Sequence, residues 1–150
     1  MSRFKASNLY RAVALLLAWA PAWGQSAGEQ VIASLEHYRL TVLDHDIEGQ
    51  VSCFTEDAQL VLGSEPVLQG RTTIRALLQS QRRFNVVTYD LRTAATRVSG
   101  SAAVQNGVYS QRIASAQASP TLAKGVFEAQ WSRQQDGSWL ISRLQMDQVE

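Results

Sequence analysis

Apolar residues recur with a helical period between residues 31 and 42. Val31, Leu35, Tyr38 and Val42 share one face at this spacing, which predicts an amphipathic first helix ending at Asp44-His45-Asp46. Residues 47–54 predict a second, shorter helix, because three apolar positions again share one side: Ile47, Val51 and Phe54. Each of these helices therefore has one face suited to a core.

After residue 55 the apolar segments become shorter. Residues 58–62 and 67–68 are predicted to form two short strands, separated by a turn rich in Gly and Pro. A third helix is predicted to begin at Gly70, with Thr72 or Thr73 as its cap. The buried stripe of this helix consists of Ile74, Leu77 and Leu78.

From Phe84 onward the pattern is typical of strands. Four are predicted, over residues 84–98, 102–113, 125–133 and 139–146, with a polar loop over 115–121. Asp136-Gly137 predicts a tight hairpin, because glycine readily adopts the positive φ that such turns need. Asn106-Gly107 predicts a bulge that bends its strand. Helices followed by a meander of strands indicate the α+β class.

The first 24 residues have the three parts of a secretory signal peptide. A basic start carrying Arg3, Lys5 and Arg11 precedes the apolar run 12–20, and Ala22-Trp23-Gly24 follows as a small-residue cleavage site. A membrane anchor or a core helix is the alternative, but the run is short for a bilayer crossing. We therefore predict a signal peptide over 1–24, a domain over 25–150, a periplasmic or secreted location, and no membrane association after cleavage.

Composition narrows the possible partners and sites. Residues 25–150 carry 11 basic and 13 acidic residues, a net charge of −2, which does not favour a nucleic-acid partner. Cys53 is the only cysteine, so no internal disulfide is possible, and its apolar context favours a buried structural thiol over a nucleophile. The spacing of His37 and His45 does not match paired helical ligands, and His45 is interpreted as part of a solvated helix end. No metal site and no cofactor are expected.

Several positions resemble the SnoaL-like and ketosteroid-isomerase-like families of the nuclear transport factor 2-like superfamily. They are Asp46, Phe54, Asp57, Ala58, Gly70, Ile74 and Arg75, then Gly107-Val108-Tyr109, Gly125-Val126-Phe127, and Trp131 through Trp139. The resemblance spans nearly all of 25–150. It implies a cone-shaped α+β fold, with three N-terminal helices packed on a curved antiparallel sheet around an apolar interior. It also implies a homodimer formed through the sheet.

The resemblance implies catalytic candidates as well. The isomerases use a Tyr and a protonated Asp to hold a substrate oxygen, and a carboxylate to move the proton. Tyr38 matches the tyrosine, eight residues before Asp46, but the position of the base falls on Leu62, which cannot move a proton. The second acid falls on Ala129, or on Glu128 if the hairpin turn is one residue longer. A packing role for Tyr38 and a surface role for Glu128, which strand alternation places on the outer face, are the alternatives.

The interior of such a fold is expected to bind a ligand through an almost wholly apolar wall. Its predicted lining is Tyr38, Phe54, Leu62, Leu78, Phe127, Trp131, Leu144 and Met146. This wall suits an apolar or aromatic small molecule. We therefore expect an exported small-molecule-binding protein with no assured catalysis. The alternatives are an isomerase, cyclase or dehydratase in which Tyr38 polarises a substrate oxygen, and a non-catalytic dimeric interaction module.

Overall fold

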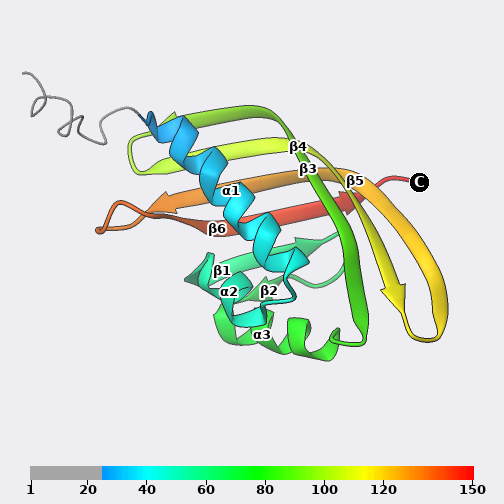
Figure 1. Ribbon diagram of the computed structural model, residues 1–150. Helices are drawn as coiled ribbons and strands as arrows, with labels where there is room; N and C mark the ends of the chain where they lie inside the picture. The colour runs from blue at the N-terminus through cyan, green and yellow to red at the C-terminus, as the bar shows by residue number, and fades with distance from the viewer. Residues whose placement is uncertain (1–24) are drawn as a thin grey trace, which may run out of the picture.

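The computed structural model describes residues 25–150, so the predicted signal peptide over 1–24 lies outside the described residues. Two helices come first and a third follows a short hairpin, after which four long strands complete the chain (Figure 1). The elements are α1 (Ala27–Leu43), α2 (Ile47–Ser52), β1 (Phe54–Leu62), β2 (Leu68–Gln69), α3 (Arg71–Ser80), β3 (Phe84–Ser99), β4 (Ala102–Ser115), β5 (Ala118–Arg133) and β6 (Trp139–Gln148).

The described strands form one six-stranded sheet in the order β2-β1-β6-β5-β4-β3. The expected sheet was antiparallel throughout, but β1 pairs with β6 in parallel, for example Leu60 with Leu144. The sheet is therefore mixed. The cause is topological, because the chain leaves β1, forms β2 and α3, and enters the sheet again at its far edge through β3. The last strand then fills the place between β5 and β1.

The helices lie on one face of the bent sheet (Figure 1). α1 packs against β3 and β6, whereas α3 packs against β1 and β2. Side chains cap the first two helices, since Ser26 Oγ accepts from the Glu29 N–H at 3.1 Å and Asp46 Oδ1 from the Gly49 N–H at 2.9 Å. The N-cap of α3 is Gly70, with φ 87°, and the prediction of Thr72 or Thr73 in that role is wrong.

Phe54 begins a strand, although the spacing had predicted that it belongs to the second helix. α2 ends at Ser52, and Phe54 starts β1 opposite Ile141 of β6. A short apolar run fits a helix and a strand equally well, so pairing with a distant strand decides the conformation. The side chain of Phe54 reaches the core by either route, and only 1% of its surface is exposed.

The predicted polar loop over 115–121 is shorter in the structure, because β5 begins at Ala118. Pro120 is accommodated inside this strand by an irregularity in the β4–β5 ladder. Ser115 pairs with Ala118 and Ile113 with Thr121, so the register shifts where Pro120 lies. A proline has no N–H to donate, and a register shift is one of the places where a strand tolerates it.

A bulge lies opposite Asn106-Gly107, but its extra residue is on β3, so the prediction of a bulge in the strand that contains Asn106-Gly107 is wrong. Thr93 pairs with Gly107 and Ala95 with Asn106, so Ala94 of β3 has no partner on β4. Gly107 also packs closely against the ring of Phe127, which a Cβ at Gly107 would approach to 2.9 Å. Glycine is required here because a Cβ would also meet the backbone carbonyl of Arg92 on the paired strand β3.

The core lies between the helices and the inner face of the sheet. On β5 the expected alternation is observed, since Phe127, Ala129 and Trp131 are buried while Glu128 is exposed. Residues from α1, β1, α3 and β6 complete the cluster, among them Val31, Leu35, Ile74, Ile141 and Leu144. None of the helices in the described part of the chain has the length and apolar character needed to cross a membrane.

Candidate functional site

Five of the predicted lining residues lie in the packed core, namely Tyr38, Phe54, Phe127, Trp131 and Leu144. Three of them, Tyr38, Phe54 and Leu144, line none of the hollows described. Tyr38 contacts Phe54 edge to face with ring centroids 5.8 Å apart, and Tyr89 lies 6.5 Å away on its other side. Leu144 is buried in the same cluster. Burial raises the pKa of the Tyr38 hydroxyl above its ordinary value, so Tyr38 stays neutral. These side chains fill the centre of the fold with each other.

The other predicted lining residues are distributed over separate hollows. Leu62 and Met146 line a hollow of about 360 Å³ beside the β1–β2 turn, and Leu78 lines another of about 360 Å³ at the far end of α1. Phe127 borders a hollow on the outer side of the sheet, although its side chain is buried in the core. Trp131 lines the largest hollow described. The structure therefore does not bring the eight residues together around one cavity.

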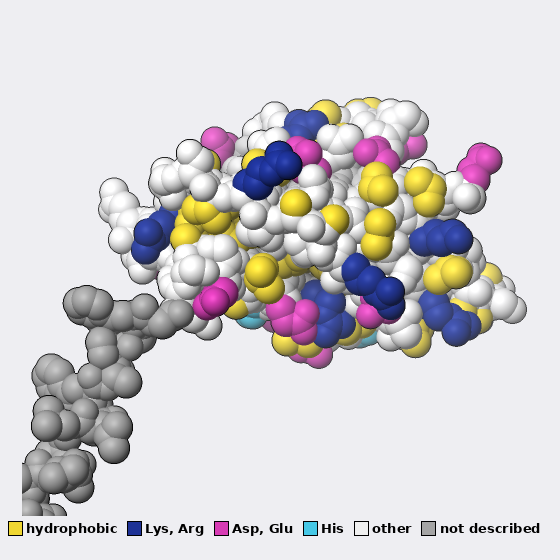
Figure 2. Space-filling model, turned by 90° about the horizontal axis from the view of Figure 1, so that it is seen from above, with side chains coloured by type: hydrophobic (Ala, Val, Ile, Leu, Met, Phe, Trp, Pro, Cys, Tyr) yellow, Lys and Arg dark blue, Asp and Glu magenta, His cyan; other side chains and the backbone are white. Residues whose placement is uncertain are grey.

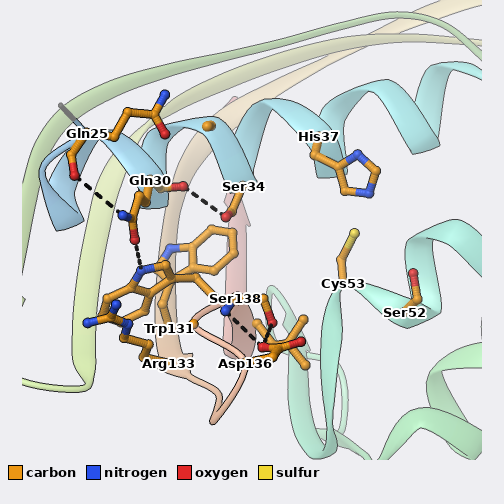
Figure 3. A pocket seen from close by; sticks show the side chains of 14 residues that line it. Gln25, Gln30, Ser34, His37, Ser52, Cys53, Trp131, Arg133, Asp136 and Ser138 are labelled. Carbon is orange, nitrogen blue, oxygen red and sulfur yellow. Dashed lines mark hydrogen bonds between the residues drawn. The ribbon is translucent and has the colours of Figure 1, made fainter. Parts of the chain in front are cut away.

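The largest hollow has a volume of about 700 Å³, and we call it the tryptophan hollow (Figure 3). It lies between the first turns of α1, the end of α2 and the β5–β6 hairpin, three segments far apart in the sequence. Its lining consists of Gln25, Gln30, Ala33, Ser34, His37, Ser52, Cys53, Trp131, Arg133, Asp136, Gly137, Ser138, Trp139 and Leu140. The volume lies in the range of ligand sites in proteins.

Two indole rings form the wall nearest to the hairpin. Trp139 donates its indole N–H to Gln30 Oε1 at 3.2 Å, which links the hairpin to α1 (Figure 3). Trp131 is 2% exposed, and its indole nitrogen has no hydrogen-bond partner among the described residues. A buried donor without a partner carries a desolvation cost of about 1–3 kcal/mol. This wall is therefore aromatic and also holds one unused hydrogen-bond donor.

The hairpin turn brings a fixed carboxylate to the rim. Asp136 Oδ1 accepts from the Ser138 hydroxyl at 2.6 Å and from the Ser138 backbone N–H at 2.9 Å. These two hydrogen bonds lower the pKa of Asp136, so the carboxylate stays ionised and is an acceptor, not an acid. Arg133, before the turn, lines the same hollow and makes no ion pair within residues 25–150.

His37 and Cys53 face each other across the opposite side of the hollow (Figure 3). Burial raises the pKa of the Cys53 thiol to about 11, and its Sγ donates to the Gly49 carbonyl at 3.3 Å. The thiol is therefore protonated near neutral pH, which agrees with the expected structural role and not with a nucleophile. No group of three or more His, Cys, Asp or Glu side chains converges as a metal site in the part of the chain described.

The two catalytic candidates are on opposite sides of the sheet. Tyr38 is buried beneath α1, whereas Glu128 is exposed on the outer face, where Gln130 Nε2 donates to its Oε1 at 3.3 Å. The sheet separates these two groups, so they cannot act together on one substrate. Nothing in the sequence pattern had placed His37, Arg133 and Asp136 beside Trp131. The sequence signal for this arrangement is weak. It consists only of two tryptophans, Trp131 and Trp139, on either side of one hairpin.

Comparison with known proteins supports one fold. The sequence profile of the SnoaL-like domain matches residues 26–145. None of the curated proteins matches the chain in sequence. Among solved structures, the chain is similar to a ketosteroid isomerase-like protein from Erwinia carotovora atroseptica, with 15% identity and a TM-score of 0.74 over 82% of this chain and 96% of that one.

Two further structures share the architecture. One is a protein of unknown function from Mycobacterium tuberculosis, with 23% identity and a TM-score of 0.71 over 81% of this chain and 70% of that one. The other is ActVI-ORFA from Streptomyces coelicolor, with 19% identity and a TM-score of 0.66 over 79% and 94%. At these identities the likeness concerns the fold alone, which is the nuclear transport factor 2-like α+β fold.

Proposed function

Because the chain belongs to the SnoaL-like domain family, we propose that it is an exported protein that binds an aromatic or apolar small molecule in the tryptophan hollow. The observation that carries this proposal is the wall formed by Trp131 and Trp139 beside about 700 Å³ of open space. Aromatic ligands stack on such walls. Export is inferred from residues 1–24 alone.

Binding without turnover fits the polar groups of the hollow better than catalysis does. The thiol of Cys53 is neutral, and the carboxylate of Asp136 is held ionised by Ser138. Tyr38, which the enzyme hypothesis needs, packs against Phe54 and does not line the hollow. A general acid or base has to reach the proton that it transfers, and none of these side chains has the pKa and the position for that role.

Filling the tryptophan hollow should block binding. Ala33 is exposed on α1 at the wall of the hollow, so Ala33→Phe introduces a ring there without removing a core contact. With 2-naphthol as the probe, we expect the indole N–H resonances of Trp131 and Trp139 to shift in the full chain. Ala33→Phe should weaken this binding about tenfold or more, as measured by NMR titration.

Ile32→Phe is the matched control for this experiment. Ile32 is the neighbouring residue on α1, is 51% exposed, and lies outside the hollow. This variant should bind 2-naphthol as the wild type does. If Ala33→Phe and the wild type bind the probe equally, the ligand site is elsewhere and the proposal fails.

The outer face of the sheet supports the proposal of a homodimer. Apolar side chains are exposed there on β4 and β5, namely Val104, Val108, Leu122 and Val126. Val108 and Val126 pair directly in the β4–β5 ladder and are 50% and 45% exposed. Exposed apolar side chains on a sheet face can pair with those of a second copy of the same face. On the upper surface, seen in Figure 2, basic and acidic side chains are interspersed among apolar ones without one dominant sign.

A charge at the centre of this face should separate the subunits. Val108→Asp places a carboxylate between two apolar surfaces, which costs several kcal/mol when it is buried without a partner. We expect native mass spectrometry of the exported protein to give twice the mass of residues 25–150, and the variant to give the single mass. Ile32→Asp, on the helical side, should stay dimeric. A wild-type monomer, or a dimeric Val108→Asp variant, would contradict the proposed interface.

A further inference from the structure

A second hollow, of about 360 Å³, lies where the end of α1, the end of α3 and the strands β3 and β4 meet. Its floor is apolar and is formed by Val42, Leu78, Val86 and Ile113. Leu78, Val86 and Ile113 are only half-buried, so part of their apolar surface is in contact with water. Covering that surface with an apolar molecule is favourable by about 25 cal/mol per Å².

The rim of this hollow has a different chemistry from its floor. It is formed by Arg82, His45 and the amides of Gln50, Gln81 and Gln111. The side chains of Arg82, His45, Gln81 and Gln111 can donate hydrogen bonds, whereas the buried Gln50 amide already donates to the Thr41 carbonyl at 3.5 Å. None of the described residues that line this hollow carries a carboxylate. The rim therefore favours an acceptor, and Arg82 favours one with negative charge.

The charged neighbours of the rim are already engaged or lie outside it. Asp46 caps α2 through the Gly49 N–H, and Asp44 does not line the hollow. Arg82 makes no ion pair within residues 25–150. The adjacent Arg83 does not line the hollow, but its guanidinium lies 4.9 Å from the centre of the ring of Phe84, which does. Arg82 is thus the positive group that faces this apolar floor.

His45 occupies an unusual backbone position for its residue type. Its φ is 56°, and the hydrogen bonds from Asp46 N to Thr41 O, at 3.0 Å, and from His45 N to Val42 O, at 3.2 Å, close the end of α1. Glycine is the usual residue at this position, and most other residues are disfavoured there. A histidine held in this disfavoured conformation places an imidazole at the rim of the hollow, which fits a role in ligand contact.

We propose that this hollow is a second ligand site, specific for an apolar organic acid whose carboxylate binds at Arg82 and His45 and whose apolar body covers Leu78, Val86 and Ile113. The site is separate from the tryptophan hollow, with which it shares no lining residue. It therefore does not depend on the function proposed for that hollow.

The experiment compares octanoate with 1-octanol, which have the same chain length but differ in charge. In the full chain, octanoate should shift the methyl resonances of Leu78 and Ile113 and leave the indole N–H resonances of Trp131 and Trp139 unchanged. Arg82→Gln should weaken octanoate binding about tenfold, since a hydrogen bond to a charged group contributes about 1.5–3 kcal/mol. The same variant should leave the affinity for 1-octanol within about twofold, because the alcohol has no charge to lose.

Two matched variants complete the test. Arg83→Gln removes a neighbouring charge that does not line the hollow and should change octanoate affinity less than about twofold. His45→Asn keeps a residue that tolerates positive φ and should weaken octanoate binding while preserving the melting temperature. Equal losses from Arg82→Gln and Arg83→Gln would overturn the proposal, because they would indicate general charge attraction. Absence of octanoate binding, or shifts confined to Trp131 and Trp139, would overturn it as well.

Discussion

Gly125→Ala is expected to lower the free energy of unfolding by about 3 kcal/mol, at the upper end of the usual cost of overpacking. A Cβ at Gly125 would lie 2.8 Å from the backbone carbon of Asp147 and 2.9 Å from the Cα of Gln148. Both are backbone atoms of β6, which pairs with β5 at this point. No side-chain rotation can relieve the contact, so the β5–β6 ladder has to move. Urea denaturation of the wild type and the variant measures the difference.

Gly28→Ala is the control of opposite sign. Gly28 lies in the first turn of α1, and a Cβ there would meet only Ser26 Oγ, at 3.9 Å. Alanine is favoured over glycine in a helix by about 0.5–1 kcal/mol, so this variant should be slightly more stable than the wild type. If both substitutions change the stability by the same amount, the close approach of β5 and β6 at Gly125 is not what determines the cost.

Phe54→Ala is expected to cost about 3–5 kcal/mol, which is a large part of the stability of a domain of this size. Phe54 is 1% exposed and packs edge to face against Tyr38, so its removal leaves a cavity between α1 and β1. Thermal and urea unfolding followed by circular dichroism would measure this loss. Phe54→Leu keeps most of the apolar volume and should lower the free energy of unfolding by less. This variant can still be compared with the wild type if Phe54→Ala does not fold.

Phe84→Ala provides the same change of side chain at an exposed site. Phe84 is 43% exposed at the start of β3, so truncation should cost less than about 1 kcal/mol. A loss at Phe54 no larger than the loss at Phe84 would show that Phe54 is not part of the core.

Local patterns predicted much of the fold. The spacing of Val31, Leu35, Tyr38 and Val42 predicted α1, and the alternation around Phe127 predicted which face of β5 is buried. The Asp136-Gly137 hairpin is also confirmed, with φ 87° at Gly137. These features depend on neighbours in the sequence, so periodicity and turn chemistry are sufficient to identify them.

Features that depend on distant partners were harder to predict. The parallel pairing of β1 with β6 joins Phe54 to Ile141, and nothing in either segment specifies the direction of that pairing. The same difficulty affected the site. The apolar lining was predicted as one set, but Tyr38 and Phe54 fill the space between them, and the largest hollow forms where Gln30, Cys53 and Trp139 meet from three elements. Such a meeting depends on packing in three dimensions.

The interior place of β6 in the sheet also bears on when the molecule can fold during its synthesis. Without β6, the strands divide into the pair β1–β2 and the meander β3–β4–β5, with no ladder between them. During synthesis β1 leaves the ribosome early and β6 leaves it last of these elements. The ladder that joins β1 to β5 through β6 therefore forms only after β6 has emerged. Pairings between segments so distant in sequence form slowly. Under the proposed export, such late pairing would let the chain pass through a narrow translocation channel before it folds.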